Sequence, residues 1–306
     1  MARHFLTLDD LHRDEILALI DRAIDLKAMW NQHGECPQIM ANRTMALVFE
    51  KASTRTRVSF EVAATQFGGN ALFLSPGDSQ LNRGESVEDT AKILSTMADI
   101  IVIRTASHAT AQTYAAVSDI PVINGLSDSY HPCQLLADLQ TLREVRGSLT
   151  NAVVTWIGDG NNMCVTWASA ASILGFKLRV CTPESYAPDF SLIDGLNAEW
   201  VEICKDPYLA SKDADVLVTD SWISMGQETQ KQERLSAFEN YQVTESLMRC
   251  ASPDAIFMHC LPAYRGLEVD AAVIDGEQSV VWQEAENRLH AQKALIELLL
   301  KRSAAN

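Results

Sequence analysis

Apolar runs as long as a buried strand alternate with helical patterns along the whole sequence. The runs predict strands at 44–49, 71–74, 100–103, 122–123, 152–157, 177–181, 216–219, 255–259 and 280–282. Apolar residues spaced three and four apart predict an opening helix from Asp9, with further helices at about 54–67, 86–97, 109–117, 133–145 and 284–301. Because strands alternate with helices, we expect parallel sheets covered by helices on both faces.

The alternation occurs in two series, which Gly-Ser-Leu-Thr at 147–150 separates. A chain of 306 residues is also about twice the length of a typical domain. We therefore predict an α/β protein of two doubly wound parallel-sheet domains, at 1–147 and 148–284.

The charge balance narrows the classes of partner. The sequence holds 25 basic and 40 acidic residues, a formal charge of -15, which repels phosphate backbones and anionic membrane surfaces. We therefore expect neither a nucleic-acid nor a membrane partner. The 7 cysteines show no Cys-x-x-Cys spacing, and no segment has the apolar length of a signal peptide or a membrane span. The expected location is the cytoplasm.

The turn after the first predicted strand has the residues of an anion site. It reads Glu-Lys-Ala-Ser-Thr-Arg-Thr-Arg at 50–57, and a helix is predicted to follow. Its hydroxyl residues can cap that helix, the free backbone N–H groups attract anions, and Arg55 and Arg57 add charged donors. The glycines of a Walker loop are absent. The turn suits a phosphate group; the alternative is a capped helix whose arginines pair with surface carboxylates.

Arg104 and His131 each come just after a predicted strand, where open α/β sheets bind ligands. His131 also opens the segment His-Pro-Cys-Gln at 131–134. Taken singly, the arginine is equally compatible with a surface ion pair, and His-Pro with the start of a helix.

In the second series, Gly-Asp-Gly-Asn-Asn-Met at 158–163 follows a strong predicted strand. Met163 replaces the third glycine of a dinucleotide fingerprint, so NAD binding is disfavoured and no cofactor is expected. Asp220 and Cys260 also follow predicted strands and could receive an amine. His259 adjoins Cys260, but neighbouring strand residues point to opposite faces, which argues against a Cys/His nucleophile pair.

Read in order, these segments resemble the aspartate/ornithine transcarbamoylase family, and most closely its ornithine branch. The matching segments are Ser-Thr-Arg-Thr-Arg at 53–57, the segment of Gln80, Arg104, His-Pro-Cys-Gln at 131–134, Asn162, Asp220, Ser-Met-Gly at 224–226, His-Cys-Leu-Pro at 259–262 and Arg288. The resemblance implies a carbamoyl-phosphate-binding domain at 1–147, an ornithine-binding domain at 148–284 and interdomain helices. It also implies a C-terminal helix at 285–306 that returns to the first domain, and a homotrimer or a multiple of it.

The resemblance also implies the site residues, with no metal ligand among them. Carbamoyl phosphate would be bound by Ser53, Thr54, Arg55, Thr56, Arg57, Arg104, His131, Pro132, Cys133, Gln134, Cys260, Leu261 and Arg288, with Gln80 reaching from a neighbouring subunit. Ornithine would be bound by Asn162, Asp220, Ser224 and Met225, and the catalytic residues would be Arg104, His131, Asp220 and Cys260.

The implied reaction carries the carbamoyl group of carbamoyl phosphate to the side-chain amine of L-ornithine and gives L-citrulline and phosphate. Negative charge grows on the carbamoyl oxygen, so donors aimed at that oxygen lower the barrier. Arg104, His131 and the Thr56 hydroxyl are the candidate donors, and Asp220 and Cys260 would orient the amine. We expect direct attack with no covalent enzyme intermediate. We also expect a role in arginine biosynthesis, although the same residues support the reverse reaction.

Three residues depart from the family pattern. Tyr264 stands where histidine is common, Cys133 where threonine is frequent, and Asn82 where glycine is frequent. Tyrosine can still form a hydrogen bond at its position, whereas Asn82 implies an altered turn.

Other acceptors and one other class of protein compete with this interpretation. Aspartate, putrescine and N-acylated ornithine are alternative amine acceptors, but Asp220 repels a dicarboxylate and the Ser-Met-Gly segment favours free ornithine. A catalytically silent phosphate- or amino-acid-binding subunit would use the same cationic turn. The joint presence of Cys260, His131 and Arg288 would be harder to explain in such a subunit.

Overall fold

The computed structural model describes residues 2–75, 77, 84–193, 195–223 and 228–303. The chain divides into two compact units, of which the first comprises Met1–Gln140 and Glu286–Asn306 and the second Thr141–Ala285. The first unit contains β1 (Thr44–Phe49), β2 (Asn70–Leu74), β3 (Ile100–Arg104), β4 (Val122–Leu126), α1 (Arg13–His33), α2 (Thr54–Gln66), α3 (Val87–Met97) and α4 (His108–Val117). The second contains β5 (Val153–Ile157), β6 (Lys177–Cys181), β7 (Val201–Cys204), β8 (Val216–Thr219), β9 (Ile256–His259), α6 (Asn162–Leu174), α7 (Pro207–Ser211), α8 (Lys231–Phe238), α9 (Glu245–Met248) and α10 (Ala271–Ile274). The chain enters the second unit within α5 (Pro132–Arg146) and returns to the first within α11 (Val281–Ser303).

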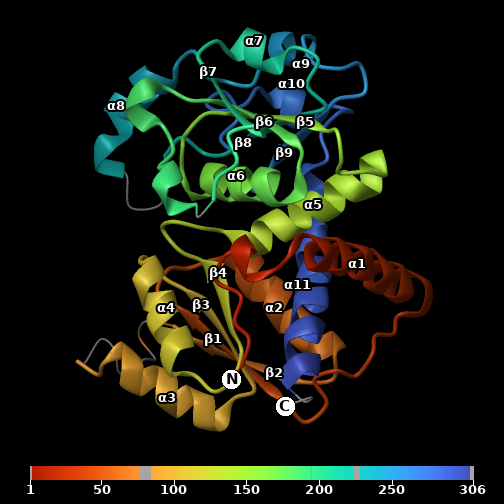
Figure 1. Cartoon of the computed structure of the whole chain (residues 1–306), viewed down its shortest axis with the longest axis vertical. Coiled ribbons are helices and arrows are strands. Elements are labelled where there is room, and N and C mark those ends of the chain that lie inside the picture. Colours follow the sequence, from red (N-terminus) through yellow and green to blue (C-terminus); the bar gives the residue numbers. More distant parts are fainter. Residues whose placement is uncertain (1, 76, 78–83, 194, 224–227, 304–306) are drawn as a thin grey trace. The chain divides into compact units, whose positions relative to one another are not determined.

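The first unit is built on a four-stranded parallel sheet of order β2-β1-β3-β4. Helices α3 and α4 cover one face, where Ala91 and Tyr114 pack in one cluster with Ala46 and Val48 of β1 (Figure 1). Helices α2 and α11 lie on the other side of this sheet (Figure 1).

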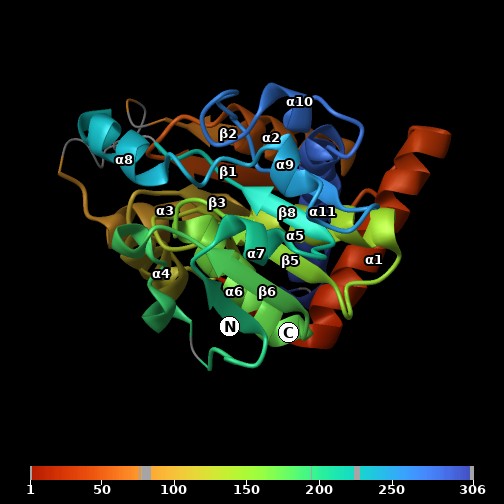
Figure 2. The same ribbon diagram turned by 90° about the horizontal axis from the view of Figure 1, so that it is seen from above.

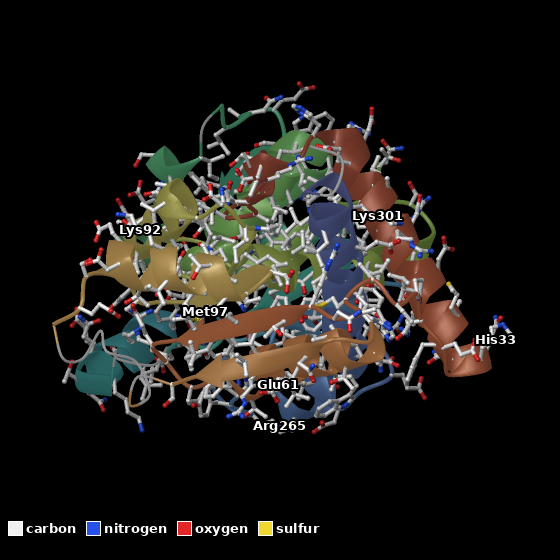
Figure 3. The ribbon with its side chains drawn as sticks, turned by 90° about the horizontal axis from the view of Figure 1, so that it is seen from below. His33, Glu61, Lys92, Met97, Arg265 and Lys301 are labelled. Atoms are coloured by element: carbon white, nitrogen blue, oxygen red, sulfur yellow. The ribbon has the colours of Figure 1, made fainter. Side chains whose placement is uncertain are left out.

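The long helices α1 and α11 contact each other within the first unit. Arg22 of α1 donates to the Glu297 carboxylate of α11 at 2.9 Å, and Lys301, labelled in Figure 3, contacts the same carboxylate. Lys27 of α1 donates to the side-chain oxygen of Asn287 at 2.7 Å. These contacts attach the C-terminal helix to the opening helix of the same unit.

The second unit is built on a five-stranded parallel sheet of order β7-β6-β5-β8-β9. Its core joins Ile157, Leu217 and Phe257 of the sheet to residues of α7, α9 and α10, and Figure 2 shows α7 and α9 over this sheet. Helix α6 is buried over most of its length, with Trp167 fully enclosed. None of the helices in the described part of the chain has the length and apolar character that a membrane crossing needs.

Each sheet contains a point where the chain connections diverge. In the first unit, β2 lies on one side of β1 and β3 on the other. In the second unit, β6 lies on one side of β5 and β8 on the other. Open α/β sheets bind ligands beyond the carboxyl ends of the strands at such a point. The turns after β1 and β3, and those after β5 and β8, are therefore the places where this fold positions ligands.

The two-sheet α/β class and eight of the nine predicted strands are confirmed, the ninth being the run at 280–282. That prediction is wrong, because Ser279 forms a single bridge to Phe257 and the chain then enters α11 at Val281. The edge strand β7 was not predicted, since its sequence Val-Glu-Ile-Cys is short and half polar. Strand prediction thus failed only where pairing is limited to one neighbour.

Core packing in the second unit yields a stability prediction. Leu217 of β8 is fully buried, whereas Leu209 of α7 in the same unit is 69% exposed. Leu217→Ala should lower the free energy of unfolding by about 2–5 kcal/mol through the cavity it leaves, and Leu209→Ala should change it by less than about 0.5 kcal/mol. Urea unfolding followed by circular dichroism measures both. Equal losses in the two variants would contradict this account of the core.

Candidate active site

The turn after β1 is fixed by a helix cap and by one carboxylate. The Ser53 hydroxyl accepts the Thr56 backbone N–H at 3.3 Å and so caps α2. The Glu50 carboxylate, at the end of β1, accepts from the Thr105 hydroxyl at 2.8 Å and from the Ala106 N–H at 2.7 Å. Glu50 therefore ties the turn after β1 to the turn after β3.

Two arginines meet at the Thr56 hydroxyl. Its oxygen accepts from Arg288 Nη2 at 3.0 Å and from Arg104 Nη1 at 3.4 Å. Arg104 ends β3, Arg288 lies on α11, and all three residues are buried. Arg288 Nη1 also donates to Gln134 Oε1 at 2.5 Å. The carboxyl ends of β1 and β3 thus carry a cluster of buried cationic donors, which suits an anionic ligand.

His131 lies in the same electropositive cluster and is neutral. It directly precedes α5 and is 6% exposed. Burial, reinforced by the charges of Arg288, Arg104 and Arg55, holds its pKa well below the usual value near 6.5. A neutral imidazole offers one donor and one acceptor, so His131 can donate to a ligand oxygen without carrying a charge.

The other residues predicted for this cluster have different surroundings from one another. Arg55 lies close enough to His131 to lower its pKa, and Pro132 begins α5. The buried Cys133 thiol donates to the Asn124 carbonyl at 3.3 Å, and burial raises its pKa to about 12, so it remains protonated. Thr54 is the exposed first residue of α2.

Arg57 is not brought into the cluster. Its Nε donates to the Glu61 carboxylate at 2.9 Å, and its guanidinium lies 3.8 Å over the ring of Phe73. Glu61 is one helical turn further along α2, so the pair forms on the exposed side of that helix. The surface ion pair, which the sequence left open as an alternative, is what the structure shows for this arginine.

A second cluster lies in the second unit, beyond β5 and β8. Asn161 caps α6 by accepting two backbone N–H groups, and its Nδ2 donates to Asp220 Oδ2 at 2.8 Å. Asp220 Oδ1 accepts from the Ser221 N–H at 2.7 Å and from the Cys260 thiol at 3.2 Å. This carboxylate is mostly buried and held by defined donors, an arrangement that can receive and orient an amine.

His259 and Cys260 lie closer together than alternation along a strand predicts. A carboxylate oxygen of Asp220, a ring nitrogen of His259 and the Cys260 sulfur all lie within 4.8 Å of one another. The expectation that the side chains of His259 and Cys260 lie apart is therefore wrong. The reason is that β9 ends at His259 and Leu261 adopts a positive φ of 57°, so the chain turns at this point. His259 Nδ1 accepts the Leu261 N–H at 2.9 Å, and its Nε2 lies 3.3 Å from Glu268 Oε1.

The same three side chains are spaced so that they could hold a metal ion. Both ring nitrogens of His259 already have protein partners, the Leu261 N–H and the Glu268 carboxylate. Binding of a metal by His259 would therefore break one of these contacts. The carboxylate and the thiol suit a cationic amine without that cost.

Some residues that the sequence singled out lie outside the described part of the chain, and others are placed without a test of their predicted role. Gln80, Ser224 and Met225 lie outside the described residues, as does Asn82. Asn162 is the first residue of α6, and its neighbour Asn161 makes the contact with Asp220. The Tyr264 side chain is 50% exposed, and its backbone N–H donates to Glu268.

Sequence reasoning missed one buried ion pair beside the second cluster. Arg234 of α8 contacts the Asp159 carboxylate and also donates to the Trp222 carbonyl. Burial raises the pKa of Asp159 to about 6 despite the opposing charge of Arg234. No local pattern pointed to this pair, because a single arginine in an exposed-looking helix resembles any surface arginine.

Comparison with known proteins agrees with the division into two kinds of site. Residues 3–144 match the family domain described as "Aspartate/ornithine carbamoyltransferase, carbamoyl-P binding domain", and residues 150–299 match its "Asp/Orn binding domain". The chain therefore belongs to the aspartate/ornithine carbamoyltransferase family.

Individual relatives match over nearly their whole length. Proteins named ornithine carbamoyltransferase are 54% identical in Hydrogenovibrio crunogenus, over 98% of this chain and 99% of the relative, and 56% identical in Nitrosococcus oceani, over 97% of each. The solved ornithine carbamoyltransferase of Pyrococcus furiosus is 45% identical with a TM-score of 0.93, covering 98% of this chain and 97% of that one.

The low pKa of His131 yields a measurable expectation. In unfolded chains histidine titrates near 6.5, so between that value and the lower pKa of folded His131 the unfolded chain binds the extra proton. His131 therefore makes stability fall as the pH drops below about 6.5, and His131→Gln removes that contribution.

Nitrogen NMR of labelled histidine at pH 6 measures the charge directly. We expect the ring signals that disappear in His131→Gln to keep the shifts of a neutral imidazole at this pH. Shifts typical of an imidazolium would contradict the electrostatic account of the cluster.

Proposed function

We propose that this chain is an ornithine carbamoyltransferase, which transfers the carbamoyl group of carbamoyl phosphate to the side-chain amine of L-ornithine and releases L-citrulline and phosphate. The observation that carries the proposal is the opposite character of the two clusters. Arg104 and Arg288 share the Thr56 hydroxyl in the first unit, and Thr56 and Arg104 lie in the segment matched to carbamoyl phosphate. Asp220 with Cys260 forms the other cluster, in the segment matched to the Asp/Orn binding domain. The first suits an anion and the second an amine.

The anion cluster would bind carbamoyl phosphate. The N-terminus of α2, with Ser53, Thr54, Arg55 and Thr56, offers backbone N–H groups and a positive dipole end to the phosphate, and Arg104 adds a second charge. In this proposal the carbamoyl group is held by residues 131–134 and Arg288, and Gln80 of a neighbouring subunit completes the phosphate contacts. Arg57 has no part in the proposal, because it pairs with Glu61.

The chemistry assigns donors to the oxygen on which charge develops. As the amine attacks the planar carbon, Arg104, the neutral ring of His131 and the Thr56 hydroxyl stabilise the growing negative charge. The buried site strengthens these interactions relative to water. The departing phosphate accepts the proton of the amine, and the transfer changes no oxidation state, so the proposed reaction requires no redox cofactor.

The second cluster would bind and orient ornithine. Asp220 attracts the amine, Cys260 and Leu261 lie on the neighbouring turn, and Asn162, Ser224 and Met225 are proposed to contact the amino-acid head group. The Cys260 thiol donates to Asp220 Oδ1 at 3.2 Å, which supports its role as a hydrogen-bonding group. We therefore assign direct attack by the amine on carbamoyl phosphate, with no carbamoyl-enzyme intermediate.

The buried carboxylate of Asp220 also bears on the choice of acceptor. A negative charge at this position repels aspartate, the acceptor in the other branch of the family, and favours a molecule with a free amine. Putrescine carries such an amine but lacks the amino-acid head group that Asn162, Ser224 and Met225 would contact.

We assign the enzyme to arginine biosynthesis, in the cytoplasm, as a homotrimer or a multiple of it. The anabolic ornithine carbamoyltransferase of Campylobacter jejuni, whose structure is solved, is 40% identical with a TM-score of 0.89 over 98% of this chain and 99% of that one. None of the seven cysteines, all of which lie in the described part of the chain, forms a disulfide, and this is compatible with a reducing compartment. These observations support the biosynthetic direction and the location, and the family resemblance supports the assembly.

The proposed activity is tested with one amine at a time. Purified protein, carbamoyl phosphate and L-ornithine should form ureido product at least about 100-fold faster than with L-aspartate, putrescine or N-acetylornithine. Product with aspartate but not ornithine would overturn the assignment of Asp220. No product with any amine, together with retained phosphate binding, would leave a silent binding subunit as the function.

Arg104 separates catalysis from binding of the amine. Arg104→Leu removes a donor aimed at the developing charge, so kcat should fall about 100- to 1,000-fold while the affinity for ornithine changes little. Arg249→Leu, which removes an arginine of an exposed ion pair in the second unit, serves as the control and should keep the kcat of the parent enzyme. Comparable losses of kcat and ornithine affinity in Arg104→Leu would assign it a binding role only.

A further inference from the structure

We infer that Asp138 is a positioning residue, which fixes the side-chain amide of Gln134 so that the site selects a carbamoyl group over an acyl group without an amine. The inference rests on the proposed function, in which Gln134 contacts the carbamoyl group. Asp138 belongs to none of the segments that pointed to the family.

The geometry places Gln134 between two groups of opposite charge. Gln134 and Asp138 are four residues apart on α5 and therefore lie on the same side of that helix. Gln134 Nε2 donates to Asp138 Oδ1 at 2.8 Å, and Gln134 Oε1 accepts from Arg288 Nη1 at 2.5 Å. Gln134 and Asp138 are each 1% exposed and Arg288 is 2% exposed. All three side chains are thus almost entirely shielded from solvent.

Only one orientation of the amide satisfies both neighbours. A guanidinium carries N–H donors and no acceptor, and an ionised carboxylate carries acceptors and no donor. Turning the amide over would set Nε2 against the guanidinium of Arg288 and Oε1 against the carboxylate of Asp138. Both hydrogen bonds would become repulsive contacts in a buried setting. The orientation of Gln134 thus follows from Arg288 on one side and Asp138 on the other.

This orientation decides what Gln134 presents to a ligand. Arg288 also donates to Thr56, so the amide oxygen of Gln134 faces the cluster to which carbamoyl phosphate is assigned. A carbonyl oxygen has two lone pairs and can accept an N–H of the carbamoyl amine together with that of Arg288. An acetyl group has a methyl at that position and offers no donor. When an acetyl group is bound, the fixed amide oxygen of Gln134 faces a methyl and loses this hydrogen bond. A buried polar group left without a partner is the strongest basis on which a site rejects a close analogue.

Without Asp138, Gln134 Nε2 loses its carboxylate acceptor, and the charged pair of neighbours no longer fixes the orientation of the amide. Gln134 can then swing away from Arg288 or turn its nitrogen towards the ligand, and the acceptor for the carbamoyl amine is no longer held in place. The phosphate contacts, which the inference assigns to other residues, do not depend on this amide. The expected defect is therefore specific to the carbamoyl amine.

The test compares three ligands that share a phosphate group. Asp138→Leu should raise the KM for carbamoyl phosphate about 10-fold, the factor expected for one lost hydrogen bond, and should leave inhibition by acetyl phosphate and by inorganic phosphate nearly unchanged. Asp138→Asn keeps an oxygen that accepts from Gln134 Nε2 and should restore most of the preference. Gln134→Leu should lose the preference as well, and the double variant Asp138→Leu/Gln134→Leu should lose no more than Gln134→Leu alone.

The matched control is Gln140→Leu. Gln140 is another buried residue of α5, and its side chain donates to Asn287. Its replacement should change thermal stability without changing the preference for carbamoyl phosphate over acetyl phosphate. If Asp138→Leu does not fold, Asp138→Ala removes the same acceptor with less apolar bulk and serves in its place.

The outcomes separate this inference from the proposed function. Equal weakening of all three ligands by Asp138→Leu, or an unchanged KM for carbamoyl phosphate, would overturn the inference, as would additive losses in the double variant. Failure of the parent protein to form ureido product would instead overturn the proposed function. A normal parent enzyme with a preference that depends on both Gln134 and Asp138 supports both.

Discussion

The sharing of one hydroxyl oxygen by two guanidinium groups holds the first unit's candidate site together. Thr56 lies in the first turn of α2, Arg104 ends β3, and Arg288 comes from α11, so one acceptor connects three segments that are distant in sequence. Their approach depends on parallel strands, whose carboxyl ends lie along one edge of the sheet. The Glu50 carboxylate strengthens the arrangement by holding the turns after β1 and β3 to each other.

Much of the fold was predictable because buried parallel strands have a strong signal. Runs such as Met45–Phe49 are almost entirely apolar, since helices cover both faces of the sheet. The signal fails at two places. Strand β7 contains Glu202 and pairs on one side only, and the apolar run at 280–282 follows the single bridge of Ser279 to Phe257 and enters α11. Pattern alone does not distinguish a strand from the start of a buried helix over three residues.

The candidate site was predictable where chemistry lies beside a strand end and not where it depends on long-range contacts. Arg104, Asp220 and Cys260 follow strands, and the parallel topology gathers them without further information. Asn161, Arg234 and Asp138 act through contacts with partners that sequence spacing does not reveal, or that look like ordinary helix neighbours. Arg57 shows the converse, since a motif position pairs with Glu61 on the surface. The net charge of -15 likewise conceals a local cluster of buried cations.

The first unit is discontinuous along the chain, and this has a consequence for biosynthesis. Residues 286–306 belong to that unit but are translated after the whole of the second unit, residues 141–285. While the ribosome is still making the second unit, the four-stranded sheet and the Ser53 cap can form, but Thr56 and Gln134 lack the guanidinium of Arg288. The nascent protein therefore cannot complete the cluster of Thr56, Arg104 and Arg288 until synthesis reaches α11, after both sheets have been made.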